Sequence, residues 1–98
     1  ILRLNLLISI INIIMNSDKI KKRLEIYFSD GKVEVFDTRG TEDHFSVIVI
    51  SNKFDKVNIV KRHQMIYEIF KKEITNEIHA MQIQAYTNEE WKKKNISK

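Results

Sequence analysis

Apolar side chains recur along residues 19–28 at the spacing of one helix face, i, i+4, i+7 and i+8. The members of this face are Ile20, Leu24, Tyr27 and Phe28. Ser17-Asp18 precedes them, and a Ser-Asp pair is typical of a helix start. Asp30-Gly31 then turns the chain. The pattern predicts an amphipathic helix whose apolar face packs on a core.

Period-two alternation follows in two short segments. Val33 and Val35 share one face of residues 33–37 (VEVFD). Phe45, Val47 and Val49 share one face of residues 44–50 (HFSVIVI), and each segment predicts a strand. The segment between them, TRGTED, is polar and contains Gly40, as expected for a loop. Two strands joined by a short polar loop predict an antiparallel hairpin.

A second and longer helix is predicted over residues 59–74, with Asn58 as its cap. The expected inner face contains Ile59, His63, Ile66, Tyr67, Phe70 and Ile74. The charged residues of this helix, Arg62 among them, are expected to face water. Phe54, in the connector that precedes the helix, is expected to enter the core.

A third strand is predicted over residues 79–86, after a break at residues 75–77. Thr87 and Glu90 have the spacing of a capping box, so a short helix that carries Trp91 is expected next, and residues 95–98 are expected to fray. The order α-β-β-α-β-α requires a long crossover that lays the last strand parallel to a neighbour. The expected fold is therefore α+β, a three-stranded mixed sheet with the helices packed on one face.

Residues 1–14 differ sharply from the rest of the chain. Ten of these fourteen residues are Ile or Leu, and Arg3 is the only charge. Fourteen residues are too few to span a bilayer, which needs about 20. We expect residues 1–16 to form an extension outside a domain that spans residues 17–94. A targeting remnant and a packed or membrane-lying helix are the alternatives.

Composition limits the chemistry of the chain. Ninety-eight residues allow one domain. The net charge is +4, and positive and negative residues are mixed along the chain. The chain has no cysteine, which excludes disulfides, a CxxC motif and a thiolate nucleophile. Any metal chemistry must use His, Asp or Glu, or thiolates from a partner. No phosphate-binding glycine loop, nucleophile elbow or convergent pair of carboxylates occurs, so we do not expect an enzyme.

The stretch from His44 to Trp91 resembles the BolA family. It reads HFSVIVISNKF, then KRHQMIYEIFKKEI, then IHAMQIQAYTNEEW, and the resemblance covers residues 17–93. It implies a KH-like (class II) fold. It also implies an accessory protein that binds a CGFS-type monothiol glutaredoxin and shares a [2Fe–2S] cluster with it and with glutathione. The implied role is iron–sulfur cluster trafficking or iron regulation.

The same resemblance assigns roles to the three histidines. His79, in the step Ile78-His79-Ala80-Met81, matches the family's cluster-ligating histidine. The loop TRGTED contains neither the cysteine nor the histidine that supplies the family's second ligand, so His44 at the strand start is the nearest candidate. His63, in the family's Arg-His step, is interpreted as a structural histidine satisfied inside the domain. The alternative for His44 is a purely structural role, as a strand-end histidine bonded to a loop carbonyl or to Asp43.

Basic residues are the remaining candidates. The expected docking charges for the glutaredoxin are Lys61, Arg62, Lys92, Lys93 and Lys94. The same charges leave open a nucleic-acid-binding transcriptional regulator, although both glycines lie in turns and no GxxG clamp occurs. A monomer that becomes a heterodimer is the simplest expectation. The expected compartment is cytoplasmic or nuclear, or mitochondrial if residues 1–14 belong to a targeting segment.

Overall fold

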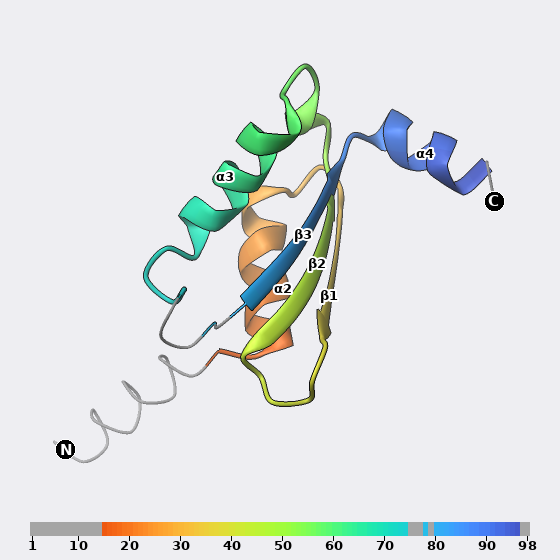
Figure 1. Cartoon of the computed structure of the whole chain (residues 1–98). Coiled ribbons are helices and arrows are strands. Elements are labelled where there is room, and N and C mark those ends of the chain that lie inside the picture. Colours follow the sequence, from red (N-terminus) through yellow and green to blue (C-terminus); the bar gives the residue numbers. More distant parts are fainter. Residues whose placement is uncertain (1–14, 75–77, 79, 97–98) are drawn as a thin grey trace, which may run out of the picture.

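The computed structural model of the chain describes residues 15–74, 78 and 80–96. Its elements alternate as expected, and a short 3-10 turn precedes the long helix (Figure 1). Their bounds are α2 (Ser17–Tyr27), β1 (Lys32–Asp37), β2 (His44–Ile50), η1 (Asn52–Phe54), α3 (Ile59–Ile69), β3 (Ala80–Tyr86) and α4 (Asn88–Ile96). The predicted α-β-β-α-β-α order is confirmed.

The three strands form one mixed sheet in the order β1-β2-β3. β1 and β2 pair antiparallel, with Val35 opposite Val47, so the predicted hairpin is confirmed. β3 pairs parallel to β2, with Val47 opposite Ile83. The long crossover through α3 allows this parallel arrangement, because parallel neighbours cannot be joined by a tight turn.

The core lies between one face of the sheet and the helices α2 and α3 (Figure 1). Three fully buried aromatic side chains fill it, and apolar residues from every layer surround them. The aromatic residues are Phe45, Phe54 and Phe70. α2 and α3 cover one face of the sheet, and α4 extends away from the end of β3 (Figure 1).

The two residues before the predicted start of the domain are part of it. Asn16 is the N-cap of α2, and its side chain accepts a hydrogen bond from the Lys19 amide at 2.9 Å. Met15 is buried in the core. The boundary at residue 17 is therefore wrong, because Met15 and Asn16 belong to the domain; residues 1–14 lie outside the described residues. Tyr27, predicted on the inner face, is 52% exposed.

The long helix is shorter and turned relative to its prediction. α3 ends at Ile69 rather than at residue 74, and the Phe70 amide closes the last turn on the Tyr67 carbonyl at 3.0 Å. Its buried residues are Arg62 and Ile66, whereas Ile59 is largely exposed. The inner face is therefore rotated toward Arg62.

The capping box at the start of α4 is confirmed. The Thr87 amide donates to Glu90 Oε1 at 2.7 Å, and the Glu90 amide donates to Thr87 Oγ1 at 3.1 Å. α4 continues to Ile96, so the predicted fraying from residue 95 is wrong for the first two residues of that segment. Among the described residues, no helix is both long and apolar enough to cross a membrane.

Candidate functional site

One end of the sheet brings together the loop between β1 and β2 and the start of β3. His44 opens β2, and its Cα partner on β3 is Ala80. The Ala80 amide donates to the Asp43 carbonyl at 3.2 Å. The His44 carbonyl accepts from the Thr38 amide at 3.0 Å and from Thr38 Oγ1 at 3.1 Å. Both neighbouring segments thus hold the backbone that carries His44.

The ring of His44 is oriented by a carboxylate. His44 Nδ1 lies 2.9 Å from Asp43 Oδ1, and the two side chains are 22% and 27% exposed. Thr41 donates its hydroxyl to the same Asp43 oxygen. A carboxylate bonded to one ring nitrogen sets the tautomer and the direction of an imidazole, the arrangement that usually supports a metal-ligating histidine.

The loop before His44 is organised by the carboxylate of Asp37, the last residue of β1. Asp37 accepts hydrogen bonds from the amides of Gly40 and Glu42, each at 2.9 Å. Gly40 and Glu42 both have positive φ angles, 71° and 59°. Glycine adopts this conformation without strain, whereas Glu42 does so at a cost. The Asp37 contacts therefore hold the loop in a defined shape beside the histidine.

The two other histidines have different outcomes. His79, the first predicted ligand, lies outside the described residues. His63 is half-buried on α3, and its role as a structural histidine stays a prediction. Within residues 15–74, 78 and 80–96, no three His, Cys, Asp or Glu side chains come together as a metal site.

Arg62 is a structural residue rather than an exposed docking charge. Only 6% of it is exposed. Its guanidinium donates to the carbonyls of Val57 and Ala85 at 2.7 and 3.1 Å, and to the two carboxylate oxygens of Glu90 at 2.6 and 3.3 Å. The prediction that Arg62 faces water is therefore wrong. Its hydrogen bond is the main reason that the pKa of Glu90 falls to about 2.

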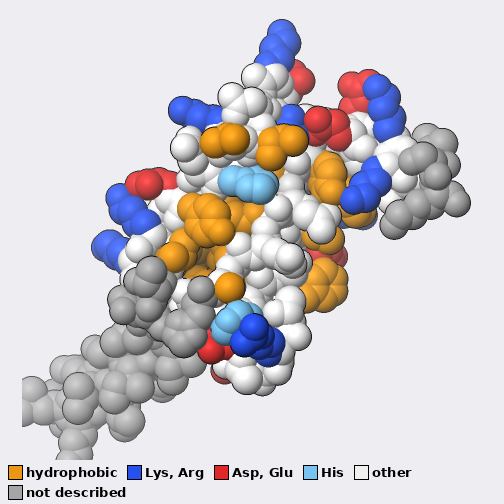
Figure 2. All heavy atoms as spheres, viewed as in Figure 1, with side chains coloured by type: hydrophobic (Ala, Val, Ile, Leu, Met, Phe, Trp, Pro, Cys, Tyr) orange, Lys and Arg blue, Asp and Glu red, His pale blue; other side chains and the backbone are white. Residues whose placement is uncertain are grey.

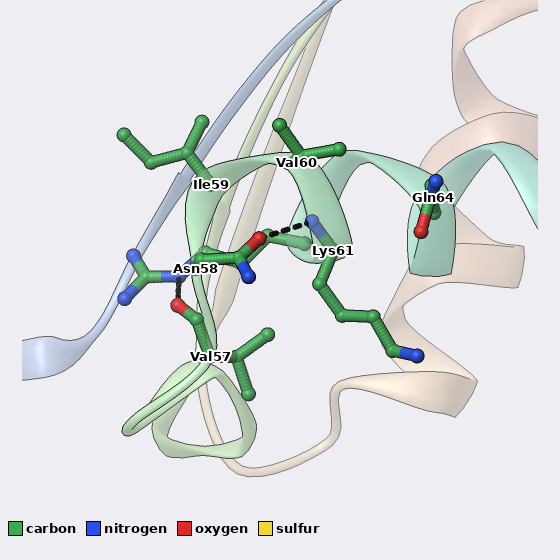
Figure 3. Close-up of a pocket in the computed structure, with 7 residues that line it drawn as sticks. Val57, Asn58, Ile59, Val60, Lys61 and Gln64 are labelled. Carbon is green, nitrogen blue, oxygen red and sulfur yellow. Dashed lines mark hydrogen bonds between the residues drawn. The ribbon is translucent and has the colours of Figure 1, made fainter.

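The predicted lysines differ in what they contact. Lys61 is exposed and lines a shallow hollow of about 610 Å³ at the start of α3, beside the exposed side chains of Ile59 and Val60 (Figure 3). Lys94 donates to the Tyr86 hydroxyl at 2.7 Å. Lys93 pairs with Glu89 at 3.3 Å, and Lys92 is exposed on α4.

The comparisons with known proteins identify the family. A family model described as BolA-like protein matches residues 2–90. This chain belongs to the BolA-like family. It is 34% identical over 88 residues to the DNA-binding transcriptional regulator BolA of Vibrio cholerae, with 83% of each chain covered. It is 40% identical over 57 residues to the protein of that name from Haemophilus influenzae, where the match covers 58% of this chain and 55% of the relative.

The solved structures agree with this assignment. The BolA domain of SufE1 from Arabidopsis thaliana superimposes with a TM-score of 0.69 at 31% identity, over 76% of this chain and 93% of that domain. The predicted family and the predicted α+β fold are both confirmed.

Proposed function

We propose that this chain docks on a monothiol glutaredoxin and shares a [2Fe–2S] cluster with it. The observation that carries the proposal is the Asp43–His44 pair at 2.9 Å, placed where β2 begins beside the start of β3 in a protein of the BolA-like family. A carboxylate-oriented imidazole at the end of a rigid sheet is suited to reaching a metal centre held by another molecule.

The donor set of this chain fits a shared cluster better than one of its own. The chain contains no cysteine, and its described residues contain no cluster of three metal-ligating side chains. Iron–sulfur clusters are usually held by thiolates, with histidine as the common substitute. The partner would therefore supply thiolates, from its cysteine and from glutathione, and this chain would supply imidazole.

His79 and His44 are the proposed ligands. His79 directly precedes Ala80 in the sequence, and the Cα partner of Ala80 is His44. In this assignment Asp43 holds the His44 ring, and the Asp37-ordered loop keeps that end compact. Exposed Lys61 and Lys92 remain candidate docking charges for the partner.

The ligand type indicates what the shared cluster would do. A neutral imidazole in place of a thiolate removes negative charge from the cluster, which raises its reduction potential and makes it more labile. These properties suit transfer or iron sensing better than storage. No step of catalysis is assigned to this chain.

The proposal is tested by adding the chain to a cluster-loaded monothiol glutaredoxin and recording visible absorption and circular dichroism. We expect a new spectrum at one equivalent. His79→Ala should weaken the change strongly, His44→Ala should weaken it less or equally, and His63→Ala, which alters a half-buried histidine away from the site, serves as the matched control. If His79→Ala and His44→Ala both behave as the parent chain does, histidine ligation is wrong.

DNA binding is the second candidate, and the printed names of the two bacterial relatives favour it. A regulator of this kind would bind a duplex with sequence preference at physiological salt. Binding that disappears as salt rises to about 150 mM would indicate only nonspecific attraction to lysines. A titration of labelled duplexes at several salt concentrations separates the two results.

A further inference from the structure

The outer edge of β3 has no strand partner among the described residues. β3 is the last strand in the order β1-β2-β3. The Ala80 amide and the Tyr86 carbonyl bond toward the β2 side, to Asp43 and to the Ser51 amide. Because backbone groups alternate between the two edges of a strand, the groups of Met81, Ile83 and Ala85 point outward.

Side chains from α3 occupy both ends of this edge but not its centre. The Tyr67 hydroxyl donates to the Met81 carbonyl at 2.9 Å, and Arg62 Nη1 donates to the Ala85 carbonyl at 3.1 Å. No side-chain hydrogen bond of the described residues reaches Ile83, midway between them. Each carbonyl has two lone pairs, so Met81 and Ala85 can accept a second bond from an added strand.

β3 lacks the features that usually protect an edge strand. Natural proteins place charges, proline or a bulge on such strands to prevent pairing with other chains. β3, with the sequence AMQIQAY, contains no charge and no proline, and it pairs with β2 in an unbroken register. β1, at the other edge, carries Lys32, Glu34 and Asp37. The contrast marks β3 as the edge that is free to pair.

An apolar stripe on α3 lies beside the same edge. Ile59 is 66% exposed and Tyr67 is 40% exposed, and both stand four residues from His63 on one helix face. Figure 2, in which β3 is at the front of the molecule, shows apolar and histidine side chains beside a strip of uncoloured polar and backbone atoms. Exposed apolar residues next to an open edge are typical of an interface.

We propose that a second copy of this chain binds this edge, with the two β3 strands antiparallel about a two-fold axis at Ile83. That symmetry places Ile83 opposite its own copy, where the two residues exchange both backbone hydrogen bonds. Gln82 then faces Gln84 of the second copy, and Met81 faces Ala85 of the second copy. Every facing pair is uncharged, and the amide side chains can bond to one another.

The apolar stripe has the same symmetry. Arg62 reaches the Ala85 carbonyl and Tyr67 reaches the Met81 carbonyl, so α3 runs antiparallel to β3 with its middle beside Ile83. Rotation about the axis therefore brings Ile59 of one copy toward Tyr67 of the other. A self-complementary surface of this kind is what an isologous interface requires. An unrelated extended segment would need only the open edge and would not require this spacing about one residue. This dimer requires neither the cluster nor the glutaredoxin.

Two exposed glutamines allow a register-specific test. Gln82→Lys/Gln84→Lys places lysine opposite lysine at both positions, whereas Gln82→Glu/Gln84→Lys places glutamate opposite lysine. Both variants lose the hydrogen bond that the Tyr86 hydroxyl donates to Gln84, so this loss does not contribute to the difference between their dissociation constants. Sedimentation equilibrium should give the parent chain twice its mass of 11.7 kDa. The Lys/Lys variant should raise the dissociation constant about tenfold, and the Glu/Lys variant should leave it equal or lower.

A charge control completes the design. Ser29→Lys/Asn95→Lys adds the same charge at two exposed positions outside β3 and should dimerise as the parent chain does. A parent chain that stays monomeric up to about 1 mM overturns the proposal. Equal dissociation constants for the Lys/Lys and Glu/Lys variants also overturn it, because the dimer would then use another surface. An edge that pairs only with a different protein would appear as the monomeric result.

Discussion

At the residue scale, Arg62 connects three parts of the molecule. Its guanidinium donates hydrogen bonds to the Val57 carbonyl before α3, to the Ala85 carbonyl near the end of β3 and to the Glu90 carboxylate of α4. Its burial could not be predicted from the sequence, because a charged residue in an amphipathic helix is normally assigned to the solvated face. Only the capping-box role of Glu90 was predictable, since it depends on local spacing.

Glu90→Gln should therefore lower the free energy of unfolding. The change leaves the Arg62 guanidinium buried without its charged partner. We expect a loss of about 1 kcal/mol, less than a fully buried ion pair would give, because the Glu90 side chain is 47% exposed and solvent screens the pair. Chemical denaturation at pH 7 measures the loss. Glu68→Gln, which breaks the exposed Lys71–Glu68 pair, is the matched control and should have no measurable effect.

The same residue predicts how stability depends on pH. In the folded state the pKa of Glu90 is about 2, below its ordinary value of 4.5. The unfolded chain therefore binds the proton more tightly, and the stabilisation is complete above pH 4.5 and is lost as pH falls toward 2. The difference in unfolding free energy between the parent chain and Glu90→Gln should shrink over that interval. A difference that stays constant from pH 7 to pH 2 would contradict the assignment.

At the element scale, apolar periodicity and capping signals predicted the α-helices and strands of the described chain, but neither the 3-10 helix η1 nor the rotation of each α-helix. Ile59 and Tyr67 fit the inner face of α3 by spacing, yet both are exposed, and Arg62 is buried there instead. A period of 3.6 residues leaves neighbouring faces nearly equivalent in a short helix. The position of the sheet, which is a tertiary feature, decides between them.

Gly31 lies so close to the backbone of β2 that no larger residue fits there without a shift. A Cβ at Gly31 would lie 1.6 Å from the Ile50 carbonyl oxygen of β2, so Gly31→Ala should destabilise the fold by about 2–3 kcal/mol. Gly40→Ala is the comparison, because Gly40 has open space around it and a φ of 71°, and it should cost about 1 kcal/mol. Thermal unfolding ranks the two variants, and equal losses would contradict the contact at Gly31.

The capping box should decide how well α4 forms. Thr87→Ala removes the hydroxyl that accepts from the Glu90 amide, at a cost of about 1 kcal/mol. Backbone chemical shifts of residues 88–96 should move toward coil values, whereas Thr87→Ser, which keeps a hydroxyl, should remain helical. An unchanged α4 in Thr87→Ala would mean that Arg62 and Trp91 hold this helix without the cap.

At the scale of the whole molecule, the sequence was sufficient for the topology and the family, because the motifs from His44 to Trp91 occur in the order that the fold requires. The candidate site was only partly predictable. His44 was found from its place at a strand start. The orientation of its ring by Asp43, and the hydrogen bonds by which Asp37 fixes the shape of the loop, depend on three-dimensional contacts. The open edge of β3 likewise became visible only with the strand order.

The central claim is that imidazole from this chain reaches iron held mainly by another protein. Pulsed electron paramagnetic resonance on the reduced complex with a monothiol glutaredoxin tests it most directly, because a coordinated histidine nitrogen couples to the cluster spin. With histidine isotope labelling confined to this chain, we predict a labelled nitrogen coupling that is reduced or lost in His79→Ala and kept in His63→Ala. A parent complex without that coupling, or a coupling unchanged in His79→Ala, would contradict the account.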